Sequence, residues 1–210
     1  MNHLSTVNEH HPSTADDLGL ERIIFFSDAV FAIAITLLVL DIRLPETGEV
    51  LEDNQFLEQF LGMWHDYLAY FISFWVIGTA WMGHHRKFRY IKRYNSRLMT
   101  LNLFFLMIIA FIPFPSSIIS KYSGPAATII YALTMFLLSL LMTAIWGYAS
   151  WHHRLIVPDL DSKQIRRQFI GPLATSLVFL FSIVVALFDE NLAKLLWLLI
   201  LFISLFAYKD

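Results

Sequence analysis

The chain has 210 residues, of which 57% are hydrophobic and 15% are charged, and its mean hydropathy is +0.59. This composition is too apolar for a soluble domain of this length and indicates a membrane protein. The chain contains no cysteine, which excludes disulfides, thiolate metal sites and cysteine nucleophiles. Its formal net charge is only −2, and its basic residues lie in short segments between apolar runs, which argues against a nucleic-acid partner.

Residues 1–20 are polar and lack the basic start and the short apolar run of a secretory signal. We therefore expect this segment to be an uncleaved, disordered cytoplasmic tail. One membrane domain is expected to follow over residues 21–210.

Six apolar segments follow the tail and predict an all-α membrane protein with six transmembrane helices. Pro45 closes the first segment, and Pro113 and Pro115 are expected to end or kink the third. The last segment is the weakest, because Lys194 interrupts its start. Short loops predict antiparallel neighbours in a single bundle. The segments are residues 23–44, 63–83, 98–119, 126–149, 170–187 and 192–208.

Lysine and arginine are concentrated on one side of the predicted bundle, mainly in the loops after the second and fourth segments. The positive-inside rule places these loops and both termini in the cytoplasm, which agrees with an even number of spans. The opposite side has only Arg43, Lys121 and Lys194. The basic residues of the inner side are Arg22, Arg86, Lys87, Arg89, Lys92, Arg93, Arg97, Arg154, Lys163, Arg166, Arg167 and Lys209.

The first outer loop is acidic. If the first helix lines a pore, this loop lies at the outer mouth and raises the local concentration of cations. The alternative is that outer loops are simply depleted of basic residues. The acidic residues are Asp41, Glu46, Glu49, Glu52, Asp53 and Glu58.

The first apolar segment carries two polar residues near its cytoplasmic end, Ser27 and Asp28. An ionisable group at this depth costs at least a few kcal/mol unless it is paired or hydrated. Partners are available at the inner ends of the second and third segments, and a structural role is favoured over protonation coupled to activity. We expect a network made of Arg22, Ser27, Asp28, Trp81, His85 and Asn102.

Large apolar residues recur along the first helix at positions 30, 33, 37 and 40, a spacing that places them on one face. Thr36 belongs to a narrower face of small residues beside this stripe. In one interpretation the stripe packs in the bundle core. In the other, copies of the helix surround an axis, Ile33, Leu37 and Leu40 form hydrophobic constrictions, and Thr36 offers a hydroxyl to a passing ion. The pattern alone does not choose between them.

Two histidine pairs, His84–His85 and His152–His153, lie at the predicted inner face. Adjacent helical residues point about 100° apart, so only one histidine of each pair can face a given site. No glutamate accompanies them, and we expect no metal site. Hydrolase, metalloprotease and phosphate-loop motifs do not occur, so we expect no enzyme. The TVGYG filter of the usual potassium channels does not occur either.

An RxxxFSD motif opens the first apolar segment and resembles the motif that opens the first helix of the transmembrane protein 175 potassium channels. The AVFAIAITLLVLDI run that follows it, and the HHRKFR and PFP sequences further on, also resemble the prokaryotic members. The similarity covers nearly the whole chain. The motif residues are Arg22, Phe26, Ser27 and Asp28.

This resemblance implies a homotetramer of six-helix subunits in a prokaryotic cell membrane, permeable to potassium and other monovalent cations and without a bound cofactor. The first helices would line the pore, with Ile33 as the constriction and Leu37 and Leu40 further outward. Thr36 would be linked to cation preference, and the FSD residues would hold the pore helix through the inner network. A coupled secondary ion transporter is the alternative, although the first segment lacks the glycine and proline breaks that transporters often show.

Overall fold

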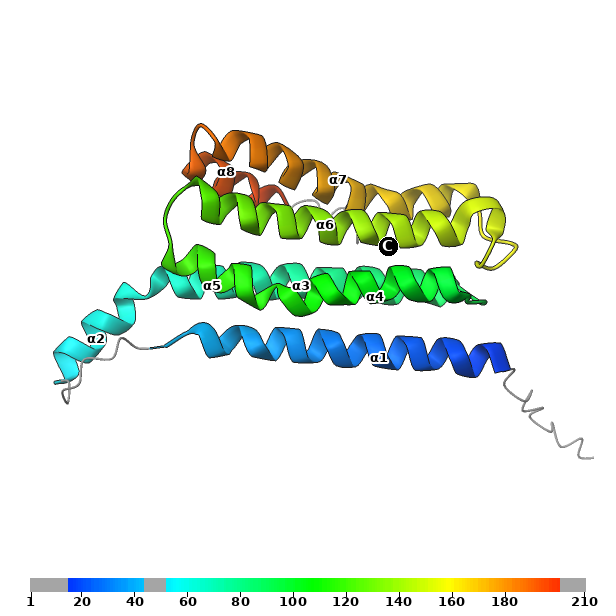
Figure 1. The fold of residues 1–210 in the computed structure, drawn as a ribbon, viewed down its shortest axis with the longest axis horizontal. Helices are drawn as coiled ribbons and strands as arrows, with labels where there is room; N and C mark the ends of the chain where they lie inside the picture. The colour runs from blue at the N-terminus through cyan, green and yellow to red at the C-terminus, as the bar shows by residue number, and fades with distance from the viewer. Residues whose placement is uncertain (1–14, 44–51, 201–210) are drawn as a thin grey trace, which may run out of the picture.

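The computed structural model describes residues 15–43 and 52–200, and the regular secondary structure within these ranges is helical, with one isolated β-bridge between two of the loops. The helices form three layers (Figure 1). Helix α1 packs on α3 and α4, α4 packs on α6, and α6 packs on α7. The layers are α1 (Ala15–Leu37) with the short turn η1 (Leu38–Asp41), then α3 (Trp64–Tyr90), α4 (Ser96–Phe111) and α5 (Pro113–Lys121), then α6 (Pro125–Ser150), α7 (Ser162–Ala186) and α8 (Glu190–Leu196).

Four spans among the described residues are long and apolar enough to cross a membrane. They confirm the first, third, fourth and fifth predicted segments. Helix α3 is long enough, with 27 residues, but its tyrosine, tryptophan and histidine residues make it less apolar. The sixth predicted segment begins in α8, and its residues 201–208 lie outside the described part of the chain. The four spans are Leu18–Asp41, Ser96–Lys121, Pro125–His153 and Ser162–Ala186.

Helix α1 begins earlier than the sequence predicted. Residues 15–20, assigned to the tail, form its first turns, while residues 1–14 lie outside the described residues. Leu20 is buried, and Gly19 lies so close to the hydroxyl end of the Tyr94 ring that a Cβ there would collide with it. The start of α1 is therefore helical because it packs against the turn between α3 and α4, a contact that hydropathy does not reveal.

The acidic loop after the first span contains a helix that hydropathy does not predict. Helix α2 (Asp53–Gly62) lies obliquely at the end of the bundle opposite the basic loops and leads into α3 (Figure 1). Glu52 and Gln55 form a capping box, in which the Glu52 backbone N–H donates to Gln55 Oε1 at 3.2 Å. This reciprocal cap satisfies amide groups that would otherwise lack partners at the start of the helix. Of the predicted acidic residues in this loop, Glu46 and Glu49 lie outside the described residues.

The predicted break in the third apolar segment is confirmed. Helix α4 ends at Phe111, and α5 starts at Pro113. Proline has no backbone N–H, and its ring clashes with the preceding helical turn. The Ile112 N–H therefore bonds to Ile109 O at 3.2 Å, one residue closer than in a regular α-helix.

Helix α1 joins the bundle through one narrow face. Ser27, Phe31, Ala34 and Leu38 are each at most 2% exposed, and their spacing of four, three and four residues places them on one side of the helix. The Phe31 ring lies 5.8 Å from that of Phe105. This buried face determines which side of α1 is left uncovered by the rest of the subunit.

The basic loops gather at one end of the bundle, the right-hand end in Figure 1. There the segment after α6 lies over the turn between α3 and α4, with an antiparallel bridge between Ile91 and Ile156. The Val157 N–H donates to Tyr90 O at 2.9 Å, and the Lys92 N–H donates to Leu155 O at 2.8 Å. These backbone bonds fix the two predicted basic loops against each other.

We predict that Phe31→Ala destabilises the subunit, whereas Ile33→Ala, two residues along the same helix, does not. Phe31 is 1% exposed and Ile33 is 59% exposed, so only the first truncation leaves a cavity inside the subunit. Truncating a buried phenylalanine to alanine costs about 3–5 kcal/mol of unfolding free energy, from lost burial and from the cavity. Thermal unfolding of the purified proteins in detergent measures the difference. Equal stability of the two variants would contradict the packing described for α1.

Candidate functional site

The large apolar residues predicted to form one stripe on α1 do not enter the core of the subunit. Ile33, Leu37 and Leu40 are 59%, 41% and 58% exposed, whereas Val30 is partly buried against the core. Thr36 is exposed, and its hydroxyl donates to Ile33 O at 2.9 Å. The first interpretation of the stripe, packing within the bundle, therefore does not describe these residues in a single subunit.

Three polar side chains join α1, α3 and α4 in a buried chain of hydrogen bonds. The His84 Nε2 lies 2.9 Å from Asn102 Oδ1, and the Asn102 amide nitrogen donates to Ser27 Oγ at 2.9 Å. The Ser27 hydroxyl donates to Ile23 O at 2.8 Å. Each of these three side chains is at most 2% exposed. An amide oxygen only accepts, so Nε2 of His84 carries the hydrogen and donates it to Asn102. The hydrogen bonds therefore all point the same way, from His84 through Asn102 and Ser27 to the Ile23 carbonyl.

The His84 ring is surrounded by aromatic side chains. It stacks on Phe88 with ring centroids 4.1 Å apart and on Phe105 at 5.7 Å, and Phe31 lies tilted at 5.7 Å. In the described part of the chain, its second ring nitrogen, Nδ1, has no hydrogen-bond partner. The ring is thus held by one polar bond and by aromatic packing.

Asp28 has a separate partner on α3. The indole N–H of Trp81 donates to Asp28 Oδ1 at 2.8 Å. Trp81 is 40% exposed, and the ring of His85 packs against it with centroids 5.8 Å apart. This contact lies at the edge of the subunit, whereas the Ser27–Asn102–His84 chain lies inside it.

Two members of the predicted network do not take part as expected. His84, and not His85, contacts Asn102, because neighbouring helical residues point about 100° apart and only His84 faces α4. Arg22 is exposed, and among the described residues no hydrogen bond or ion pair joins it to Asp28. The spacing of apolar residues along α3 could have predicted that His84 is the buried histidine. Ile77 and Phe88 lie on the same face of the helix as His84 and are also buried.

The histidine pairs do not converge on a common site. His84 is buried, His85 packs on Trp81, and the His153 ring lies 3.3 Å from Leu160 O. His152 and His153 have φ angles of 49° and 53°, so their backbone turns sharply away from α6. Within residues 15–43 and 52–200, no group of three or more histidine, aspartate or glutamate side chains is close enough to hold a metal ion.

Comparisons with known proteins agree with this architecture. The family model described as endosomal/lysosomal potassium channel TMEM175 matches residues 22–113, which include the RxxxFSD motif and the histidine and asparagine of the network. A protein named a potassium channel in Streptomyces collinus is 38% identical over 151 residues, which cover 69% of this chain and 71% of that protein. A second protein named a potassium channel, from Chamaesiphon minutus, is 33% identical over 148 residues, which cover 69% of this chain and 72% of that protein.

A solved structure is similar over nearly the whole chain. It is described as the crystal structure of a lysosomal potassium-selective channel TMEM175 homolog from Chamaesiphon minutus. The TM-score is 0.80 at 26% identity, and the match covers 91% of this chain and 100% of that one. Sequence and structure together show that this chain belongs to the TMEM175 family.

Proposed function

We propose that this protein is a potassium channel in which copies of α1 from four subunits surround a central pore. The observation that carries the proposal is the exposure of Ile33, Leu37 and Leu40 on a helix whose opposite face is buried. Two relatives are named potassium channel, which supports potassium as the ion that this protein transports. The fourfold assembly would give the exposed face of α1 a partner, since each copy would meet its equivalents at the axis.

The proposed subunit has six spans, with both termini in the cytoplasm. Helix α3 would be the second span, because its aromatic residues suit the two membrane interfaces and its 27 residues exceed the length of the hydrocarbon core. Residues 192–208 would supply the sixth span. The gathering of the basic loops at one end of the bundle supports the cytoplasmic assignment of that end.

The proposed constriction is a set of hydrophobic rings. Ile33 would form the narrowest ring, with Leu37 and Leu40 further toward the outside, and these rings would gate by excluding water. Thr36 lies between them on the exposed side of α1, where its hydroxyl oxygen can accept contacts from a hydrated cation. Permeation would need no cofactor and no chemical step.

A coupled transporter is the second candidate. The break at Pro113 and the Pro172 inside α7 favour it, because transporters often use interrupted helices. Helix α1 argues against it, because no glycine or proline interrupts the helix from residue 22 to residue 37. Potassium flux from liposomes separates the two. A channel passes current down a potassium gradient with no second substrate, and a strict requirement for a co-transported ion would overturn the channel assignment.

Ile33→Asn is predicted to raise the conductance. A ring of amides would hydrate the constriction and remove the barrier that dewetting creates. Val39→Asn is the control, because Val39 is also exposed, at 49%, and lies outside the stripe, in η1 directly after α1. Single-channel recording in planar bilayers measures both variants. If Ile33→Asn carries no more current than the parent protein, or if Val39→Asn gains as much, Ile33 is not the gate.

Asp28→Ala is predicted to destabilise the assembled protein, because the Trp81 indole N–H loses its acceptor. Because Trp81 is 40% exposed, the expected loss is the net value of one hydrogen bond, about 0.5–1.5 kcal/mol. Asp28→Asn keeps an oxygen at the same place and should retain most of the stability. Thermal melting and gel filtration in detergent report stability and assembly. An unchanged melting temperature for Asp28→Ala would exclude the structural role.

Neutralising the outer acidic residues is predicted to lower the current at low salt and to leave the potassium–sodium reversal potential unchanged. Glu52, Asp53 and Glu58 are exposed at α2, and water screens such charges within about 8 Å at physiological salt. A diffuse negative field attracts potassium and sodium alike. Glutamine and asparagine replacements, extended to Glu46 and Glu49, test this in bilayers at two salt concentrations. A shifted reversal potential would show that the acidic residues at the mouth, and not α1, determine ion selectivity.

A further inference from the structure

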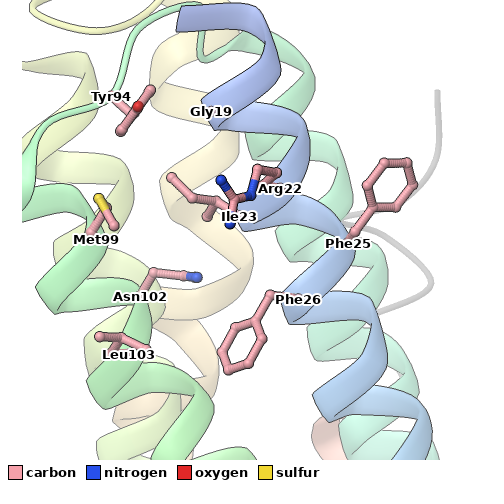
Figure 2. A pocket seen from close by; sticks show the side chains of 9 residues that line it. All are labelled: Gly19, Arg22, Ile23, Phe25, Phe26, Tyr94, Met99, Asn102 and Leu103. Carbon is pink, nitrogen blue, oxygen red and sulfur yellow. The ribbon is translucent and has the colours of Figure 1, made fainter. Parts of the chain in front are cut away.

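The exposed stripe of α1 continues toward the basic end of the bundle into a groove. Arg22 and Phe26 lie eleven and seven residues before Ile33, a spacing that places all three on one side of the helix. Beside them a groove of about 570 Å³ separates α1 from the first turns of α4, where Met99 and Leu103 form its other wall (Figure 2). The groove therefore belongs to the face of α1 that the proposed assembly covers, and a second copy of this chain is the partner that can fill it.

Phe25 lies on the other flank of α1. Its side chain is 69% exposed, and Figure 2 shows its ring directed to the opposite side of the helix from Met99 and Leu103. Ala29 and Ala32 follow it at spacings of four and three residues, so they share its side of the helix, and both are exposed. Small side chains let a neighbouring helix approach closely. Phe25 therefore protrudes from a flank that is otherwise suited to close helix packing.

A closed ring of identical subunits brings unlike surfaces together, because each copy meets the next head to tail. With Ile33 toward the axis, Phe25 lies about 80° around α1 in one direction, and the groove lies in the other direction, toward α4. The flank that carries Phe25 thus meets the groove flank of the next copy. Rotation about an axis normal to the membrane leaves depth unchanged, and Phe25 lies within about 1.5 Å of the depth of Phe26, beside the apolar part of the groove.

Charge complementarity supports the same pairing of surfaces. Arg22 lies one turn from Phe26 toward the basic end of the groove, and no aspartate or glutamate lines the groove. Glu21 lies one turn from Phe25 in the same direction, and both charged side chains are exposed. Within the described residues no ion pair joins Glu21 or Arg22 to another side chain. A copy that inserts Phe25 therefore brings a carboxylate to the end of the groove that carries an unopposed guanidinium.

We propose that Phe25 of each subunit inserts into the groove between α1 and α4 of the next subunit. There it packs on Met99 and Leu103, which are 40% and 55% exposed in a single subunit, and Glu21 lies beside Arg22. The inference rests on the proposed fourfold assembly and specifies which surfaces meet in it. Each α1 then contacts α4 of its neighbour as well as the neighbouring α1.

The floor of the groove connects this contact to the inner network. Asn102 lines the groove and is 2% exposed, and its amide nitrogen donates to Ser27 Oγ of its own subunit at 2.9 Å. A ring inserted from the next subunit would exclude water from the side of this hydrogen bond, which strengthens the bond. Assembly would therefore stabilise the contact that fixes the rotation of α1.

Exchanging the charges tests the polar part of the contact. Glu21→Arg should raise the dissociation constant of the full-length tetramer in detergent, by up to about fivefold for each exposed ion pair lost. Adding Arg22→Glu should restore it, whereas adding Arg89→Glu should not, although Arg89 and Glu21 line a common groove within one subunit. Sedimentation analysis over a dilution series measures the constants. Restoration by Arg89→Glu, or by neither change, would exclude the contact between Glu21 and Arg22.

The chain has no cysteine, so pairs of introduced thiols report the apolar part of the contact directly. In the double variants Phe25→Cys/Met99→Cys and Phe25→Cys/Leu103→Cys, mild oxidation in detergent should yield covalently linked subunits on a denaturing gel. The corresponding single variants should run as monomers, because equivalent residues of two copies do not meet in this arrangement. Phe25→Cys/Leu177→Cys is the matched control, because Leu177 is also exposed, at 58%, but lies on α7, in another layer (Figure 1). Linking in neither test pair, or equal linking in the control, would overturn the proposal.

The single variant Ile33→Cys tests the proposed axis separately. Its thiols should link subunits in pairs, because the Ile33 side chains of different copies meet at the axis in the proposed pore. Linking at position 33 without linking of position 25 to either partner would overturn this inference and leave the pore assignment standing. The converse result would support the contact at Phe25 and contradict the pore.

Discussion

The hydrogen bonds that Ser27 and Asp28 accept from neighbouring helices are the constraint on which the rest of this structure depends. A polar group inside a bilayer has no water to bond and must find its partner within the protein. Ser27 finds Asn102 on α4, and Asp28 finds Trp81 on α3. Two polar contacts to two different helices fix the rotation of α1 about its own axis, which apolar packing alone would leave less specific.

This fixed rotation has a direct consequence for the opposite face. With Ser27, Phe31, Ala34 and Leu38 buried, the residues about half a turn away must be exposed, and Ile33 is among them. A narrow buried face also means that α1 is attached to its subunit less extensively than α6, which packs against both α4 and α7. Such a helix is suited to an interface between subunits, where its remaining apolar surface is covered by its equivalents.

Much of the fold could be predicted from hydropathy and from proline positions. The break at Pro113 and four of the spans follow from rules that act locally along the chain. The start of α1 and the helix α2 could not be predicted in this way. The former depends on the contact between Gly19 and Tyr94, which are far apart in sequence, and the latter on a capping box followed by a weakly apolar helix.

The polar network was predictable in its composition but not in its geometry. The sequence identified Ser27, Asp28, Trp81 and Asn102 as members of the network, and the structure pairs Asp28 with Trp81 and Ser27 with Asn102. Depth cannot distinguish His84 from His85, which differ by one residue and by about 100° around the helix. His84 is the buried histidine because its ring packs against the rings of Phe31 and Phe105, which belong to two other helices.

The central claim is that the exposed face of α1 meets its equivalents at the axis of an assembled channel. An experimental structure of the purified oligomer in a lipid environment tests this most directly. The account predicts a fourfold assembly in which the Ile33 side chains of all subunits are the atoms nearest to the axis. An assembly in which α1 faces the lipid, with another helix at the axis, would contradict it.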